Sequence, residues 1–245
     1  MIRFDTNNYE FNKSSDIGVY IIHGFSNTTY EVKELAEFLG NQGFHTIANN
    51  LPGHGTTPEE CNRVRYQMWL EYVTQDLANL ISVSKKTYVI GCSMGADLAL
   101  YLSSIFPING CVVGGTVLKF KNPLTIHLLI PLLCKIIKFS KKEIKNNTTT
   151  KYYGYTSYPL IALNEMRKLT NMIRKKLPKV RVPLLIIHSY ADRLSLIENV
   201  DLVYNRTKSI SKEKFFVKNA HHNLFDENKD QKKIFNKILN FITKH

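Results

Sequence analysis

Residues 87–102 read TYVIGCSMGADLALYL and decide how the rest of the chain is interpreted. The β-branched run 87–90 predicts a strand, and the apolar spacing after Met94 predicts a helix. Between them, Gly91-Cys92-Ser93-Met94-Gly95 matches the pattern G-x-S-x-G. A serine in a sharp turn from strand to helix has a strained backbone, and only glycine permits close approach on both sides of it. This setting predicts a serine nucleophile raised above a sheet; the plainer alternative is a turn of small residues.

Strand and helix patterns alternate on both sides of this turn, which indicates a mostly parallel central sheet flanked by helices. The expected strands are 18–22, 44–48, 87–90, 111–113, 184–188 and 214–217. The expected helices are 30–41, 68–83, one beginning near 94, 198–204 and 231–243. The alternation breaks between 114 and 183. The predicted fold class is therefore α/β, and a chain of 245 residues suits one such domain with a modest insertion.

A serine is a weak nucleophile at neutral pH and needs a general base that is oriented by an acid. In this topology the acid and then the histidine follow the serine along the chain. Asp192 follows the strand 184–188, and His221 and His222 follow the last strand. All three lie where strands end, which is the edge at which open α/β sheets bind ligands. We expect Asp192 and His221 to complete a triad with Ser93, with His222 as the alternative base.

Other residues of the same types have plainer interpretations. Asp192 itself is also suited to capping a helix or to stabilising a turn, and Asp201 lies inside an expected helix. His188 ends a strand and is expected to be a packed neighbour of the site. His54, in Pro-Gly-His-Gly, is expected to brace a loop.

The oxyanion of an acyl-transfer reaction needs two backbone donors. Met94 N–H, directly after the serine, is the first candidate because it opens a helix. The loop His23-Gly24-Phe25 follows the strand 18–22, and Gly24 lets the backbone approach closely. Phe25 N–H is therefore the second candidate.

These motifs resemble those of bacterial carboxylesterases and monoacylglycerol lipases of the α/β-hydrolase superfamily, of the small thermostable-esterase type. The matching residues are His23-Gly24-Phe25, Gly53-His54-Gly55, Gly91-Cys92-Ser93-Met94-Gly95, Asp192, and Asn219-Ala220-His221 followed by Asp226. In that family an Asp follows the catalytic histidine by five residues, which favours His221. The resemblance covers the whole chain in order, although 116–178 matches only in position and Ala96 stands where a second glycine is common.

The resemblance implies hydrolysis of monoacylglycerols or of short- to medium-chain acyl esters through an acyl-enzyme. A thioesterase, or a hydrolase of amide or C–C bonds, would use the same triad. A ligand-binding protein that keeps the fold but turns over weakly is the alternative from another class. No metal, nucleotide or flavin motif accompanies the triad, so no cofactor is expected.

The resemblance also implies a small cap, 119–165, inserted into a core made of 1–118 and 166–245. The most apolar stretch of the chain, 124–137, lies in this cap, and Pro131 should kink a helix there. It predicts either a buried cap helix with a solvated rim or a lid that lines an acyl pocket and touches lipid. The residues expected to line that pocket are Leu124, Leu128, Leu129 and Leu132. Residues 146–150 (NNTTT) are expected to form a mobile loop.

The net charge of +13 is concentrated in one part of the chain. Residues 119–176 contain 13 lysines and arginines against two glutamates. This excess indicates either a solvated lysine face or peripheral contact with anionic lipid, and without a nucleic-acid-reading motif no nucleic-acid partner is expected. No run reaches the ~18 apolar residues of a membrane span, and the N-terminus has no apolar signal region. We therefore expect a soluble cytoplasmic protein; nothing in the sequence indicates its oligomeric state.

Overall fold

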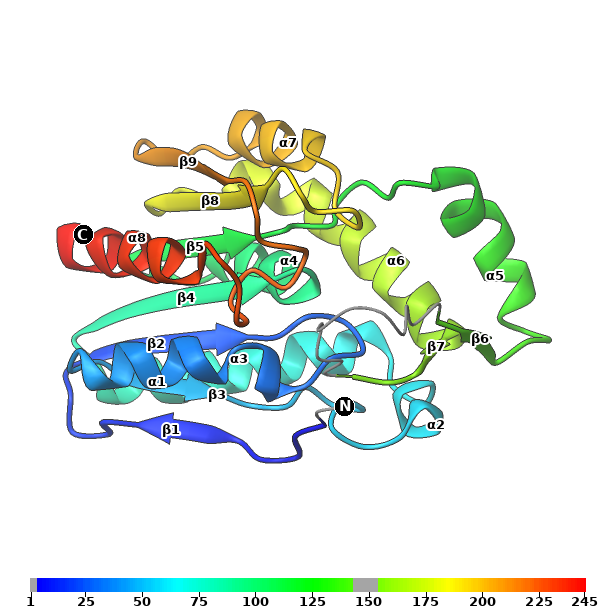
Figure 1. The fold of residues 1–245 in the computed structure, drawn as a ribbon, viewed down its shortest axis with the longest axis horizontal. Helices are drawn as coiled ribbons and strands as arrows, with labels where there is room; N and C mark the ends of the chain where they lie inside the picture. The colour runs from blue at the N-terminus through cyan, green and yellow to red at the C-terminus, as the bar shows by residue number, and fades with distance from the viewer. Residues whose placement is uncertain (1–3, 143–153) are drawn as a thin grey trace.

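The computed structural model describes residues 4–142 and 154–245, and a seven-stranded sheet forms its centre (Figure 1). The strands lie in the order β1-β3-β2-β4-β5-β8-β9. Their bounds are β1 Tyr9–Phe11, β2 Ile17–Ile22, β3 His45–Ala48, β4 Lys86–Cys92, β5 Gly110–Gly114, β8 Leu184–Ser189 and β9 Lys212–Val217. β1 runs antiparallel to β3, and every other neighbouring pair in this sheet is parallel. The expected α/β fold class with a mostly parallel sheet is confirmed.

Helices cover both faces of the sheet (Figure 1). One face carries α1 Lys33–Asn41 and α8 Gln231–Lys244, and the other carries α3 Tyr66–Val83, α4 Met94–Ser103, α6 Leu160–Lys176 and α7 Glu198–Arg206. Successive side chains of a strand point to opposite faces. On β2, Val19 and Ile21 therefore join the core under α1 and α8, whereas Tyr20 and Ile22 join the other core. Burial on both faces holds the strands in register.

This register brings the carboxyl ends of the parallel strands to one edge. Ile22 at the end of β2 lies opposite Gly91 of β4, and Ser189 at the end of β8 lies opposite Val217 at the end of β9. The loops that follow β2, β4, β8 and β9 therefore emerge side by side. These are the loops on which the sequence places the candidate site residues.

The main difference from the expected elements is α6, which lies where no regular pattern was expected. Its Leu169 and Ile173 pack into the main core, whereas Leu160 at its start packs against Ile130 and Cys134. The helix is amphipathic, and it is covered on one side by α3 and α4. The proposed boundary between cap and core at 165/166 therefore falls inside one continuous helix.

The segment expected to form a cap, 119–165, contains an arm and a hairpin that project beyond α6 (Figure 1). The arm is a π-helical turn, Thr125–Leu129, that leads into α5 Ile130–Leu133, with Pro131 in the first turn of α5. The hairpin pairs β6 Phe139–Lys141 with β7 Ser157–Pro159 beside α2 Pro58–Cys61. The expected mobile loop 146–150 lies outside the described residues.

The arm buries few of its apolar side chains. Ile130 and Cys134 pack against Leu160, with Ile126 partly buried beside them. The large side chains that remain exposed are Leu124, Leu128, Leu129, Leu132, Leu133, Ile136 and Ile137. The expectation of a buried cap helix is therefore wrong for this arm, because only one side of the arm packs against the rest of the protein.

Cys92 and Cys111 lie fully buried on β4 and β5. All four cysteines are free thiols and are buried. Across residues 4–142 and 154–245, no helix combines the length and hydropathy that a transmembrane span requires.

Candidate active site

Ser93 stands on the turn between β4 and α4 with φ 56° and ψ −120°, a conformation that L-residues rarely adopt. The glycines around it have no room for a side chain. A Cβ on Gly91 would lie 2.1 Å from the Gly95 carbonyl oxygen, and a Cβ on Gly95 would lie 2.1 Å from that of Ile22. The G-x-S-x-G pattern therefore exists because two backbone segments pass directly against the turn.

Ser93 forms one end of a hydrogen-bonded relay. Its Oγ lies 2.8 Å from Nε2 of His222, and Nδ1 of the same ring lies 2.8 Å from Oδ2 of Asp192. The Asp192 carboxylate can only accept in this pair, so Nδ1 carries the ring proton and Nε2 accepts from the serine hydroxyl. A nucleophile, a base and an orienting acid are therefore in contact.

The prediction that His221 is the base is wrong in geometry, because His222 occupies that position. Ala220 is fully buried in the core beneath the loop, which turns His221 outward and leaves it exposed. His222 then faces Ser93. The spacing to Asp226 misled the prediction, because in this chain Asp226 follows the base by four residues.

Asp192 orients the imidazole and caps its own loop. Its side chain is fully buried, and Oδ1 accepts hydrogen bonds from the N–H groups of Leu194 (2.8 Å) and Ser195 (2.9 Å). Burial alone would raise the pKa of Asp192, but its bonds to His222 and to these N–H groups outweigh burial and lower it. The carboxylate is thus held ionised. Of the plainer alternatives, the turn residue holds alongside the orienting contact and the helix cap does not, because α7 begins only at Glu198 and its N-cap residue is Ile197.

The opposite shift occurs at His222, whose side chain is 13% exposed. Burial favours the neutral ring, but the hydrogen bond and charge of Asp192 outweigh it and raise the pKa of His222 above its ordinary value. Gly115 passes beside the pair with φ +57°, and a Cβ there would lie 3.4 Å from both Asp192 Oδ2 and His222 Cε1. Sequence reasoning missed Gly115, although two glycines directly after an apolar strand are a signal of such a turn.

The loop after β2 fixes one peptide plane beside the serine. The Gly24 carbonyl oxygen accepts from His23 Nδ1–H (2.9 Å) and from Asn27 N–H (3.3 Å). Leu51 N–H donates to His23 Nε2, which requires the His23 proton to be on Nδ1. No described peptide is cis, so Phe25 N–H points away from these two donors.

Two backbone donors are left open near the serine. Within the described chain, neither Phe25 N–H nor Met94 N–H donates to a protein acceptor. Met94 is the first residue of α4, where N–H groups have no intrahelical partner. A Cβ on Gly24 would lie 3.1 Å from the Ser93 Cβ, so the loop is in contact with the nucleophile.

The remaining histidines near the site are packed, as expected. His54 Nδ1 lies 3.2 Å from the Pro52 carbonyl oxygen, and burial lowers the pKa of His54 to about 3. His188 is buried, and burial lowers its pKa as well. Neither ring is hydrogen-bonded to Ser93.

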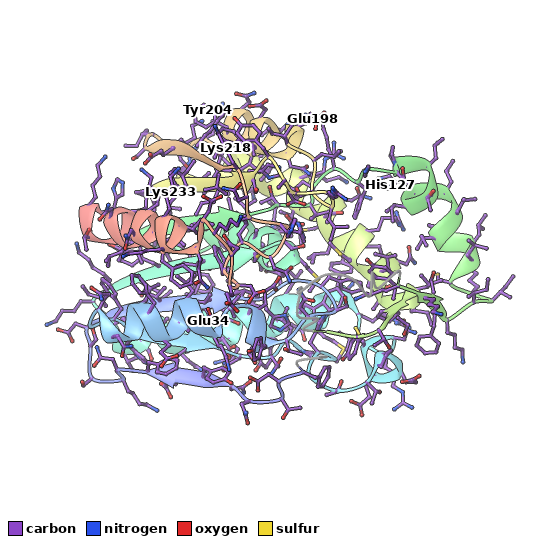
Figure 2. The ribbon with its side chains drawn as sticks, in the orientation of Figure 1. Glu34, His127, Glu198, Tyr204, Lys218 and Lys233 are labelled. Atoms are coloured by element: carbon purple, nitrogen blue, oxygen red, sulfur yellow. The ribbon has the colours of Figure 1, made fainter. Side chains whose placement is uncertain are left out.

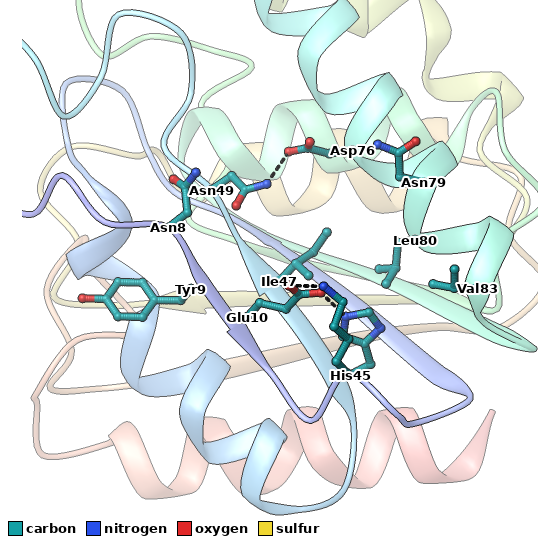
Figure 3. Close-up of a pocket in the computed structure, with 11 residues that line it drawn as sticks. Asn8, Tyr9, Glu10, His45, Ile47, Asn49, Asp76, Asn79, Leu80 and Val83 are labelled. Atoms are coloured by element: carbon teal, nitrogen blue, oxygen red, sulfur yellow. Dashed lines mark hydrogen bonds and ion pairs between the residues drawn. The ribbon is translucent and has the colours of Figure 1, made fainter.

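A separate hollow of about 600 Å³ lies along the outer edge of the sheet, between β1, β3 and α3 (Figure 3). Its carboxylates are already engaged within the protein. Glu10 accepts from His45 and Lys13, and Asp76 accepts from Asn49 and, deeper in the core, from Tyr20. None of the relay residues lines it.

The four leucines expected to line a substrate pocket lie on the arm. Leu124, Leu128, Leu129 and Leu132 are 72%, 60%, 49% and 64% exposed. The structure does not enclose them, so their contact with an acyl chain stays a prediction.

A strained serine at the carboxyl edge of a parallel sheet, bonded to a histidine and then to an aspartate, defines a serine hydrolase with an α/β-hydrolase fold. The chain belongs to the family described as "Serine aminopeptidase, S33", whose model matches residues 13–229. The expected superfamily and the assignment as an enzyme are thereby confirmed.

Two curated relatives cover nearly the whole chain. It is 27% identical to the thermostable monoacylglycerol lipase of Bacillus sp. (strain H-257), over 95% of this chain and 93% of that protein. It is 21% identical to the carboxylesterase of Bacillus subtilis (strain 168), over 89% of each. The chain is thus similar to a monoacylglycerol lipase and a carboxylesterase over most of its length.

Solved structures share the fold. One from a study of LipS and LipT, two metagenome-derived lipolytic enzymes, superposes with a TM-score of 0.91 at 24% identity and covers 100% of both chains. The monoacylglycerol lipase of Paleococcus ferrophilus superposes with a TM-score of 0.82 at 17% identity, over 98% of this chain and 99% of that one.

Proposed function

We propose that the protein hydrolyses carboxylic esters, either monoacylglycerols or short- to medium-chain acyl esters, with Ser93, His222 and Asp192 as its triad. The relay of 2.8 Å contacts from Ser93 through His222 to Asp192 carries this proposal. The similarity to a monoacylglycerol lipase and a carboxylesterase supports the choice of esters.

Acylation begins when Ser93 Oγ attacks the ester carbonyl carbon and its proton passes to His222 Nε2. The carbonyl oxygen becomes an oxyanion, for which Phe25 N–H and Met94 N–H are the open donors. The tetrahedral intermediate collapses when His222 returns the proton to the leaving alcohol oxygen. Water then repeats the sequence on the acyl-enzyme, with His222 taking its proton, and releases the acid and Ser93.

Two measurements test this function. A fluorophosphonate should label Ser93, and p-nitrophenyl esters of two to twelve carbons should give a turnover maximum at a medium chain length. Acyl thioesters of the same lengths separate esterase from thioesterase activity. Absence of labelling at Ser93 would favour the binding protein with weak turnover.

We also propose that the exposed arm, 124–137, contacts an anionic lipid surface. Leu124, Leu128, Leu132 and Ile136 are 60–84% exposed, and each buried CH₂ contributes about 0.8 kcal/mol. Exposed lysines flank the arm at positions 119, 121, 135, 138 and 141, and no Asp or Glu occurs between 98 and 142. Each such lysine adds about 1 kcal/mol of attraction near anionic headgroups.

Co-sedimentation with vesicles of phosphatidylcholine and phosphatidylserine tests this contact. Binding at low salt should weaken at high salt, since the attraction is screened. Leu132→Asp and Lys135→Glu should reduce binding. Ile210→Asp and Lys218→Glu make the same changes at exposed positions elsewhere, and Figure 2 shows Lys218 well away from His127 on the arm. Equal loss in all four variants, or no binding at low salt, would reject the contact.

The proposal includes a cytoplasmic location, which is supported by four buried thiols that form no disulfide. Fractionation of cells that express the full chain, with assay of each fraction, tests it.

A further inference from the structure

Glu31 is a buried carboxylate beside the nucleophile that takes no part in the relay. It ends the short 3₁₀ turn Thr29–Glu31 and is fully buried. Its Oε2 accepts from Gly24 N–H at 2.6 Å, and its Oε1 accepts from Asn27 Nδ2–H at 2.8 Å. Both oxygens are therefore committed to the loop that follows β2.

Gly24 lies between this carboxylate and the nucleophile. A Cβ on Gly24 would lie 3.1 Å from Glu31 Oε2 and 3.1 Å from Ser93 Cβ. Only a glycine backbone separates the two side chains. If Glu31 shifts, either Gly24 shifts with it or the hydrogen bond from Gly24 N–H to Glu31 is lost.

Two successive peptide planes of this loop are held from different sides. The Gly24–Phe25 plane is held by the donors to the Gly24 carbonyl oxygen, His23 Nδ1–H and Asn27 N–H. The His23–Gly24 plane is held by Glu31 through Gly24 N–H. With both planes fixed, Phe25 N–H has one direction, which is the preorganisation that an oxyanion donor requires.

We infer that Glu31 is a positioning residue that holds the Gly24 backbone so that Phe25 N–H meets the oxyanion formed at Ser93. The inference rests on the proposed function, because it concerns the oxyanion of that reaction. Glu31 touches no reacting atom. Its length, which lets the carboxylate reach Gly24 N–H, is the property that matters.

A role for the charge of Glu31 is the competing explanation. Burial raises the pKa of Glu31, against the lowering effects of Gly24 N–H, the His222 ring and Asn27. Glu31 is also close enough to His222 to favour its protonated form. A charge role requires a carboxylate of any length, whereas a positioning role requires an oxygen acceptor at the native distance.

Two conservative variants separate these roles. Glu31→Gln keeps the length and an oxygen acceptor but removes the charge, whereas Glu31→Asp keeps the charge and is one CH₂ too short. Glu165 is a matched control, because it is also buried and its Oε2 accepts from a backbone N–H, that of Tyr66 at 3.3 Å. Glu165→Gln and Glu165→Asp therefore repeat both changes on α6.

The measurements are kcat and KM on a medium-chain p-nitrophenyl ester, the Ki of a trifluoromethyl ketone, and thermal unfolding. The ketone forms a tetrahedral adduct with serine, so its Ki reports oxyanion binding while KM does not. We expect Glu31→Asp to lower kcat about 10- to 100-fold and to raise Ki by a similar factor, with KM nearly unchanged; the upper end approaches the loss of a whole oxyanion donor. Glu31→Gln should stay within about threefold, as should both Glu165 variants.

Three outcomes overturn the inference: Glu31→Gln more damaged than Glu31→Asp, an unchanged ketone Ki in Glu31→Asp, or unfolding of Glu31→Asp while Glu165→Asp stays folded. The last outcome would make Glu31 purely structural. Wild-type ester hydrolysis tests the proposed function separately. If the ester is not hydrolysed, the rate of fluorophosphonate labelling at Ser93 supplies the same comparison of variants with wild type.

Discussion

Two regions of the molecule differ in which side chains they bury: the edge of the sheet that carries Ser93, and the arm 124–137. At the edge, polar side chains are buried and hydrogen-bonded, and glycines leave no space around them. On the arm, large apolar side chains such as Leu132 and Ile136 are 64% and 84% exposed. Proton transfer needs atoms at fixed distances, whereas contact with hydrocarbon is non-directional and tolerates a loose surface. Single substitutions should therefore lower activity by large factors at the edge and by small factors on the arm.

The largest effect is expected at the nucleophile. Ser93→Ala should lower kcat by about 10⁶-fold and leave the fold intact, because the whole relay depends on Oγ. Ser103→Ala is a matched control, as Ser103 is a buried serine on α4 whose Oγ donates to the Ala99 carbonyl oxygen and is not hydrogen-bonded to His222. Steady-state ester hydrolysis with circular dichroism measures both. Near-wild-type activity in Ser93→Ala would refute the assignment.

The two adjacent histidines should differ sharply. His222→Ala should lower kcat by at least about 10⁴-fold, because the serine loses its base. His221→Ala should remain within about threefold, because this side chain is exposed on the outer side of the loop. Parallel assays of the two variants decide between them, and the reverse order would contradict the relay described above.

The pH profile depends on Asp192. The pKa of His222 is raised above its ordinary value, so the base is lost by protonation as the pH is lowered. The fall in kcat/KM on acidification should therefore already begin while the pH is above about 6.5, the ordinary pKa of histidine. In Asp192→Asn the stabilising charge is gone, so the fall should move to lower pH, and kcat should drop about 10⁴-fold. Profiles from pH 4.5 to 9 measure both. An acid limb that does not move would mean that Asp192 does not set this pKa.

A much smaller, selective effect is expected on the arm. Leu129→Asp should lower medium-chain turnover about tenfold and acetyl-ester turnover less than twofold, because only longer chains gain about 0.8 kcal/mol per buried CH₂ there. The control is Ile210→Asp, at a fully exposed position outside the cap. The chain-length series is the measurement, and a uniform loss would assign the arm a structural role only.

The contrast between edge and arm also separates what the sequence predicted from what it did not. The parallel sheet and the positions of Ser93 and Asp192 follow from local patterns, because strand ends align at one edge whatever the loops do. The base was misplaced by one residue, because burial of Ala220 rather than spacing along the chain decides which histidine turns inward. Glu31 had no motif to mark it, since its partner is a backbone N–H seven residues away.

The cap was predicted least well. α6 was missed although Ala162, Met166, Leu169 and Ile173 recur at helical spacing, because lysines and arginines interrupt the pattern. The outward orientation of the arm leucines depends on which stripe meets Leu160. That contact is tertiary and leaves no periodic signal in so short a segment.

The left-handed backbone of Ser93 implies that a side chain at this position lowers the stability of the folded protein. Ser93→Ala and Ser93→Gly both remove Oγ, but only glycine adopts φ 56° and ψ −120° without steric conflict. We expect the glycine variant to unfold at higher denaturant concentration than the alanine variant, by about 1 kcal/mol after its greater chain entropy is subtracted. Part of the stability of the fold is thus spent on backbone strain at one residue, and packing around the turn holds that residue in a conformation it would leave if released.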